Sequence, residues 1–153
     1  MKKLVSIIFF TYCSFASPSS LDEVRTLFEK AAKEEGYCNE LLKMLSAKDV
    51  EENVVLAGYK GCATMLKARY AFNPVNKLKY FKKGKALLED AIRKEQNNAE
   101  LRYLRLTVQT NSPSFLGYKN HIETDRIFLA NALENISDPF LQKAIRKHLE
   151  HSQ

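Results

Sequence analysis

The sequence predicts an all-α fold, and three observations lead to this prediction. Apolar residues recur at spacings of three and four, and helix start and stop signals separate the periodic stretches. No stretch alternates with a period of two between hairpin turns. Only 5 Gly and 4 Pro occur in 153 residues, which is sparse for an all-β protein with its many tight turns. We therefore expect about seven helices with short connections, stacked as antiparallel helix hairpins.

Residues 1–16 have the pattern of a secretory signal peptide. Two lysines precede a mostly apolar run over 4–12, and small residues stand where a signal peptidase would cleave after Ala16. The run is shorter than the roughly 20 apolar residues that span a bilayer, which disfavours a retained anchor. A lipoprotein acylated at Cys13 is the other alternative. We expect 17–153 to be a single helical domain, exported to the periplasm or secreted, with membrane association left open.

The first three helices are expected before residue 72. Ser20 with Glu23 indicates a capping box for a helix that Gly36 ends, and a short helix then covers about 38–46. Asp49 is expected to cap the third helix, over about 50–71.

Two glycines lie inside the third expected helix. Gly58 and Gly61 each cost about 1 kcal/mol relative to alanine at such a position. A neighbouring helix that approaches closely, with no side chain in the way, would offset this cost. We therefore expect a close helix contact at this level.

Four further helices complete the expected stack. The fourth covers about 75–95, with Leu78 in its buried stripe, and the fifth covers about 99–110. The sixth begins at Asn120. The motif Ser137-Asp138-Pro139 combines a polar cap with proline at the first helical position, which strongly indicates the start of the last helix.

Two cysteines remain after cleavage, Cys38 and Cys62. An oxidising compartment and an even count permit one disulfide. If the second and third helices form a hairpin, the two residues differ by only about 6 Å along the pair, which brings a bond within reach. We favour the bond, and two buried free thiols are the alternative.

The segment 80–100 resembles the second helix of a tetratricopeptide repeat and the turn after it. A small residue, a bulky one and an alanine stand at the repeat's spacing as Gly84, Leu88 and Ala91, whereas Gln96 replaces the usual proline. The resemblance covers about a third of the chain and implies a stack of helix hairpins. The whole chain is also similar to small exported helical proteins of Gram-negative bacteria that have no assigned function, which supplies no catalytic residue.

The middle of the chain is strongly basic. Residues 53–88 contain no acid, whereas 17–52 carry more acids than bases. The basic residues are Lys60, Lys67, Arg69, Lys77, Lys79, Lys82, Lys83 and Lys85. Lys79, Lys82 and Lys83 are neighbours on a helix and would form a cationic ridge. The alternative is a solvated face that the acidic helices of 17–52 balance.

Two binding functions follow from these patterns. The first is a non-catalytic protein-interaction or scaffold module of the cell envelope, because stacked hairpins form a concave groove for a partner protein. We expect that groove to be lined by the residues Tyr59, Tyr70, Tyr80, Tyr103, Lys77, Lys79, Lys82 and Lys83. The second is binding of anionic lipid or glycan through the ridge.

The connection over 112–118 is a second candidate surface. Phe115 and Tyr118 follow a proline in a loop, where exposed aromatic residues often serve as binding anchors. The alternative is that Phe115 and Leu116 fold back to close the end of the stack.

Catalysis has little support in the sequence. His121 and Asp125, four apart, could form an acid–base pair of a small hydrolase, although such pairs are more often solvated contacts. There is no His-Glu-x-x-His motif, phosphate-binding glycine loop or nucleophile elbow. We expect no enzyme activity, no metal and no cofactor, and the export signal argues against nucleic acid as a partner. The oligomeric state stays open.

Overall fold

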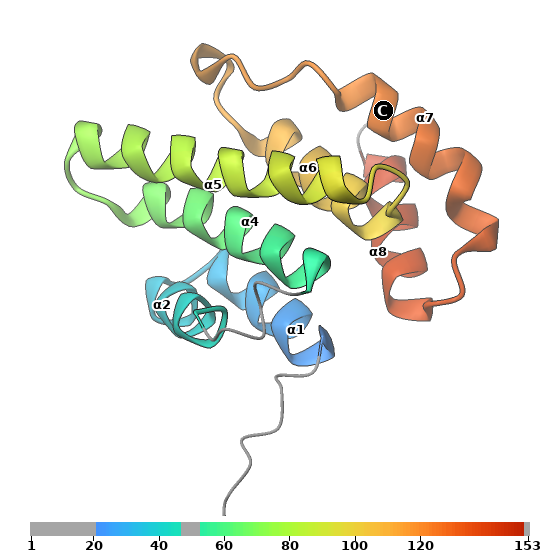
Figure 1. Cartoon of the computed structure of the whole chain (residues 1–153), viewed down its shortest axis with the longest axis horizontal. Coiled ribbons are helices and arrows are strands. Elements are labelled where there is room, and N and C mark those ends of the chain that lie inside the picture. The colour runs from blue at the N-terminus through green and yellow to red at the C-terminus, as the bar shows by residue number, and fades with distance from the viewer. Residues whose placement is uncertain (1–20, 47–52, 152–153) are drawn as a thin grey trace, which may run out of the picture.

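The computed structural model describes residues 21–46 and 53–151, and these residues form seven α-helices, two 3₁₀ turns and no strand (Figure 1). The elements are α1 (Leu21–Ala31), α2 (Glu35–Met44), α4 (Val54–Tyr70), α5 (Pro74–Lys94), α6 (Ala99–Asn111), η1 (Ser114–Leu116), α7 (Ile122–Ala132), η2 (Leu133–Asn135) and α8 (Pro139–His151). The predicted all-α fold class is confirmed. The predicted signal peptide and the predicted caps Ser20 and Asp49 lie outside the described residues.

The antiparallel hairpin of α4 and α5 forms the centre of the molecule. α1 and α2 pack on one side of α4, while α6 packs against both α4 and α5, and α7 and α8 pack on α6 (Figure 1). Two apolar clusters result. The larger one joins α1, α2, α4, α5 and α6, and the smaller one joins α6, α7 and α8 around Leu106, Leu129 and Ile145.

The central hairpin is close because glycines face each other across it. A Cβ atom on Gly61 would lie 2.7 Å from the backbone nitrogen of Leu88 and 2.8 Å from the carbonyl oxygen of Gly84. A Cβ atom on Gly84 would in turn lie 2.6 Å from the backbone nitrogen of Met65. The predicted close helix contact at Gly61 is thus confirmed. Gly58 lies against the Leu101 side chain of α6.

Helix boundaries in the first half differ from the prediction. Gly36 does not end the first helix: α1 ends at Ala31, and Gly36 lies in the first turn of α2 after an extended Glu34. Helix α4 begins at Val54, not near residue 50, because the Asn53 side chain caps it by accepting a hydrogen bond from the Leu56 N–H at 3.0 Å.

Boundaries in the second half are closer to the prediction. The start of α8 is confirmed: Oδ1 of Asp138 accepts hydrogen bonds from the N–H groups of Phe140 (3.0 Å) and Leu141 (3.1 Å). Helix α7 begins after His121, whose side chain makes no cap, so the predicted start at Asn120 is early by about one residue.

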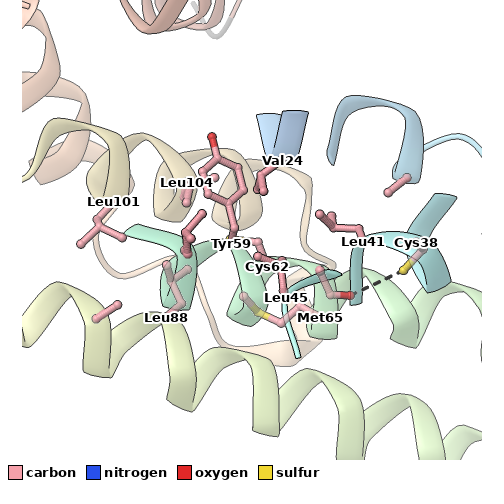
Figure 2. Packing of buried hydrophobic residues seen from close by; sticks show 14 of the residues in the cluster. Val24, Cys38, Leu41, Leu45, Tyr59, Cys62, Met65, Leu88, Leu101 and Leu104 are labelled. Carbon is pink, nitrogen blue, oxygen red and sulfur yellow. Dashed lines mark hydrogen bonds between the residues drawn. The ribbon is translucent and has the colours of Figure 1, made fainter. Parts of the chain in front are cut away.

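The expected disulfide between Cys38 and Cys62 is wrong, and both residues are buried free thiols. The estimate that the two cysteines lie at a similar level along the helix pair was close, because the Cys38 thiol lies 3.7 Å from the carbonyl oxygen of Ala63, the residue after Cys62. The two cysteines differ in direction. Figure 2 shows Cys62 within the central cluster near Tyr59 and Leu45, well away from Cys38 at the α2 side.

Candidate functional site

Three of the four predicted lysines, Lys79, Lys82 and Lys83, lie on the outer face of α5. Asn73 caps this helix and Pro74 occupies its first turn, so its N-terminal half is regular and presents its side chains at fixed spacing. The basic ridge consists of three exposed lysines, Lys79, Lys82 and Lys83. Lys77 is also exposed, but it precedes Phe81 by four residues and so stands on the side of the helix that carries the buried stripe. Within the described residues, none of these four lysines has a carboxylate within 4.0 Å. The ridge therefore carries three positive charges that no carboxylate of the described residues neutralises locally.

The position of α4 explains why these charges stay unpaired. α5 contacts α4 and α6 but neither α1 nor α2, which lie on the far side of α4 (Figure 1). The cations that meet the acidic helices belong to α4: Lys67 lies 3.4 Å from Glu35, and Arg69 donates to the Ala32 carbonyl oxygen. The alternative in which 17–52 balances the ridge is thus wrong for the described part, 21–46.

Exposed apolar side chains accompany the ridge. Phe72, in the turn between α4 and α5, is fully exposed, and Val75 and Leu78 are 73% and 44% exposed. Leu78 was expected in the buried stripe, but that stripe is carried by Phe81, Gly84 and Leu88.

The apolar side chains and the lysines share one helix face. Val75 precedes Lys79 by four residues and Leu78 precedes Lys82 by four, so apolar and cationic side chains are neighbours on the helix surface. We call this combined surface of the basic ridge with Phe72, Val75 and Leu78 the α5 patch.

The tyrosines expected to line a groove have other positions. Tyr59 is only 3% exposed, and its hydroxyl donates to Oε1 of Glu100 at 2.7 Å, so it is a core residue (Figure 2). Burial first, and then the Glu100 carboxylate, raise the pKa of Tyr59 well above its usual range. The Tyr70 hydroxyl donates to the Ala31 carbonyl oxygen at 2.7 Å.

The two remaining groove candidates differ from each other. Tyr103 packs edge-on against His148 of α8, with ring centroids 5.9 Å apart. Tyr80 is half-buried on α5, next to the α5 patch. Of the four tyrosines, only Tyr80 thus lies beside the ridge.

The two aromatic residues of the α6–α7 loop also have different positions. Phe115 is 87% exposed, whereas Tyr118 is buried against α5. The alternative in which the loop folds back is correct for Leu116, which packs against the main core, and wrong for Phe115.

The predicted acid–base pair does not form. The Asp125 carboxylate is fully buried, and the Arg105 guanidinium binds it in a bidentate manner at 2.7 and 2.8 Å. Arg102 adds a third hydrogen bond at 2.7 Å. His121 meets Asp125 only through its carbonyl oxygen, which accepts from the Asp125 N–H at 2.8 Å.

A second buried ionic cluster surrounds Arg25 and was missed by the sequence analysis. Its guanidinium donates to both oxygens of Glu100, at 2.7 and 2.8 Å, and to Oδ2 of Asp138 at 2.7 Å. These bonds, led by the one to Glu100, raise the pKa of Arg25 further above its usual range. The cluster joins α1, α6 and the start of α8, and its charged groups are fully occupied by one another.

Neither metal chemistry nor a membrane span is indicated in the described residues. No group of three or more His, Cys, Asp or Glu side chains there could hold a metal ion. No helix over 21–46 and 53–151 is long and apolar enough to cross a bilayer.

No protein-family model, curated protein or solved structure matches the chain. The α5 patch is therefore identified from its geometry and charge alone.

Proposed function

We propose that this protein attaches reversibly to an anionic lipid bilayer through the α5 patch. The observation that carries the proposal is the combination on one helix face of three exposed lysines without carboxylate partners and two exposed apolar side chains, with the exposed Phe72 in the turn before that helix. Basic residues interleaved with apolar ones are typical of helices that lie in the membrane interface, where the apolar groups enter the acyl boundary and the cations meet lipid phosphates.

The apolar part of the patch favours lipid over a glycan or an acidic protein surface. A lysine close to an anionic leaflet contributes about 1 kcal/mol, so the three lysines of the ridge supply about 3 kcal/mol. That is weak and sensitive to salt, because surface charges are screened within about 8 Å at physiological ionic strength. Full burial of one phenylalanine adds about 1.5–3 kcal/mol. Phe72 already stands free of the protein core and could insert without any loss of packing.

Unpaired lysine side chains are well suited to binding at a membrane surface. The flexible stem of lysine lies along apolar surface while the ammonium group stays in water or at phosphate. The export predicted from residues 1–16 would bring the protein to envelope membranes, and it remains a prediction, as does the tetratricopeptide likeness.

The groove-based scaffold hypothesis keeps less support than the lipid proposal. Tyr59 lies in the core and is not available to a partner, and the hydroxyl of the half-buried Tyr70 is occupied by the Ala31 carbonyl oxygen. The hydrolase hypothesis remains a prediction without its acid–base pair. An acidic protein partner at the α5 patch is the competing occupant and is one outcome of the test below.

The test is co-sedimentation with vesicles of phosphatidylcholine, alone or mixed with phosphatidylglycerol, at low and moderate salt. The variant Lys79→Glu/Lys82→Glu/Lys83→Glu is compared with Lys143→Glu/Arg146→Glu/Lys147→Glu on α8. The two triples share the same charge change, the same spacing and exposed positions. The control breaks only an exposed pair with Glu134, worth about 0–1 kcal/mol.

We expect wild type to bind the mixed vesicles and to bind pure phosphatidylcholine much more weakly. The ridge triple should lose about 100-fold in affinity, from about 1 kcal/mol for each of three lysines, and the α8 triple far less. Equal losses in both triples would leave only a net-charge effect and refute the patch. Absence of vesicle binding, with an acidic protein retained through the ridge instead, would replace lipid by a protein partner.

A further inference from the structure

The loop between α6 and α7 has a defined shape. The Ser112 hydroxyl donates to the Val108 carbonyl oxygen at 2.7 Å, and the Leu116 N–H donates to that of Pro113 at 3.1 Å. Gly117 takes the left-handed conformation, with φ of 60°, and its N–H donates to the Ser114 carbonyl oxygen at 3.1 Å. This is a helix-terminating turn that glycine favours. The side chains of the loop therefore point in fixed directions.

Tyr118 fastens the loop to α5. Its ring meets Phe81 edge-on, with centroids 5.9 Å apart, and the Lys85 ammonium lies 4.7 Å from the ring centroid. Its hydroxyl donates to Oε1 of Glu89 at 2.5 Å. A buried aromatic ring with a satisfied hydroxyl is a strong anchor. Since Leu116 also packs into the main core, the loop is held on the α5 flank from two positions.

Phe115 points away from this anchored base. It is 87% exposed although Leu116, the next residue, is packed. Since Leu116 and Tyr118 fix the loop, Phe115 cannot turn inward without releasing one of them. The exposed ring contributes nothing to the packing of the fold, and its full burial in another apolar phase would be favourable by about 1.5–3 kcal/mol.

The flank that holds the loop adjoins the α5 patch. Phe81 and Lys85, which contact Tyr118, follow Leu78 and Lys82 by three residues each and are their neighbours on the helix. In Figure 1 the loop runs above α5, and the α4–α5 turn with Phe72 lies at the N-terminal end of the same helix. Phe72 thus lies in the turn at one end of the patch, and the loop that carries Phe115 is fastened through Tyr118 to the adjoining flank of the same helix.

We propose that the α6–α7 loop is a second insertion point, so that the protein sits on an anionic bilayer with Phe72 and Phe115 both in the acyl boundary and the lysines of α5 at the lipid phosphates. This inference rests on the proposed function and adds the orientation. Two separated anchors would hold α5 close to parallel with the membrane plane, whereas insertion of Phe72 alone would let the molecule pivot about the turn.

The absence of tryptophan from the chain makes a direct test practicable. Phe72→Trp, Phe115→Trp and Ile127→Trp each introduce the single tryptophan of the protein at an exposed position. Ile127 lies on α7, which does not contact α5, and serves as the matched control. Each variant is titrated with phosphatidylcholine–phosphatidylglycerol vesicles, with and without brominated acyl chains, and bound protein is measured by co-sedimentation. All three variants are made in the same chain, so residues 1–20 are identical in each and cannot cause a difference between them.

We expect emission from Phe72→Trp and Phe115→Trp to shift to the blue on binding and to be quenched by brominated lipid, and emission from Ile127→Trp to stay unchanged. Phe115→Ser should weaken binding about tenfold, for loss of a partly inserted ring, with the circular dichroism spectrum unchanged.

The outcomes separate the two proposals. If the protein binds but Phe115→Trp reports water and Phe115→Ser binds like wild type, the second insertion point is refuted and the α5 patch stands alone. If no variant sediments with anionic vesicles, the proposed function itself fails. If Ile127→Trp is quenched as strongly as the other two, the orientation is wrong.

Discussion

The substitution Gly61→Ala provides a test of the central hairpin in which two physical effects have opposite signs. Alanine is the better helix former, and by propensity alone the change in the middle of α4 should stabilise the protein by about 1 kcal/mol. The new methyl group, however, would meet backbone atoms of α5 at 2.7 and 2.8 Å.

The steric effect should be the larger one. Ordinary contacts of a Cβ atom begin near 3.4 Å, so α5 would have to move away from α4 by roughly 0.7 Å. Backbone atoms within a helix cannot turn aside as the end of a side chain can. Overpacking of this kind costs about 1–3 kcal/mol, and the displacement would also loosen Leu88, which is fully buried. We expect Gly61→Ala to lower the free energy of unfolding by up to about 2 kcal/mol after the propensity gain.

The measurement is urea denaturation followed by far-UV circular dichroism, with Gly36→Ala as the matched control. A Cβ atom on Gly36 would meet nothing within 4 Å, so the same chemical change in the first turn of α2 should be neutral or stabilise by up to about 1 kcal/mol. A Gly61→Ala protein more stable than wild type by the full propensity gain of about 1 kcal/mol, with an unchanged denaturant slope, would show that α4 and α5 are not packed as closely as described.

Three further predictions concern the interior. Asp125→Asn should destabilise by about 3–5 kcal/mol in the same assay, because it leaves two arginines of α6 without their fully buried charge partner; a loss below 1 kcal/mol would contradict this. Burial, and then Arg126, lower the pKa of His148, so wild-type stability should fall as the pH drops through the unfolded value of about 6.5. His148→Gln should flatten that pH dependence, and an unaltered profile would exclude His148 as its source. Iodoacetamide should leave Cys38 and Cys62 unmodified in the native protein, as read by mass spectrometry, and alkylate both in urea, since burial raises the pKa of each thiol.

Local signals were sufficient for most of the helices. The proline and aspartate at the start of α8 and the asparagines before α5 and α6 act through hydrogen bonds within one turn, so their effect can be predicted from neighbouring residues alone. Gly36 shows the limit. A glycine can end one helix or begin the next, and the choice here follows from the packing of Ala31 and Cys38, which the local sequence does not describe.

The buried charges were missed because a charged residue was taken as a surface residue. Arg25 lies four residues after Leu21 and three before Phe28, which places it on the apolar face of α1. Asp125 stands three after Ile122 and four before Leu129 in the same way. The spacing of both residues therefore could have predicted that they are buried. The partners could not be predicted, because Glu100 is 75 residues away from Arg25 in the sequence.

The candidate site shows the same division. The four lysines and Phe115 could be identified from composition and loop position. The ridge lysines lack carboxylate partners because α4 lies between α5 and the acidic helices α1 and α2. This tertiary arrangement cannot be predicted from the local sequence. Tyr59 failed as a groove residue for the same reason: its spacing placed it on a helix face, and α1 and α6 cover that face.

The use of arginine and lysine supports the interpretation of the α5 patch. Among the described residues, the buried cations are the arginines Arg25 and Arg105, and each binds a carboxylate with two parallel hydrogen bonds. The planar guanidinium suits such fixed pairs, whereas the lysine ammonium is strongly hydrated and mobile. The ridge contains only lysine, next to apolar side chains that the fold leaves exposed. Because the ridge lysines Lys79, Lys82 and Lys83 pair with no carboxylate of the described residues, a conservative Lys→Arg series on the ridge should leave both stability and attachment to anionic vesicles within about twofold of wild type.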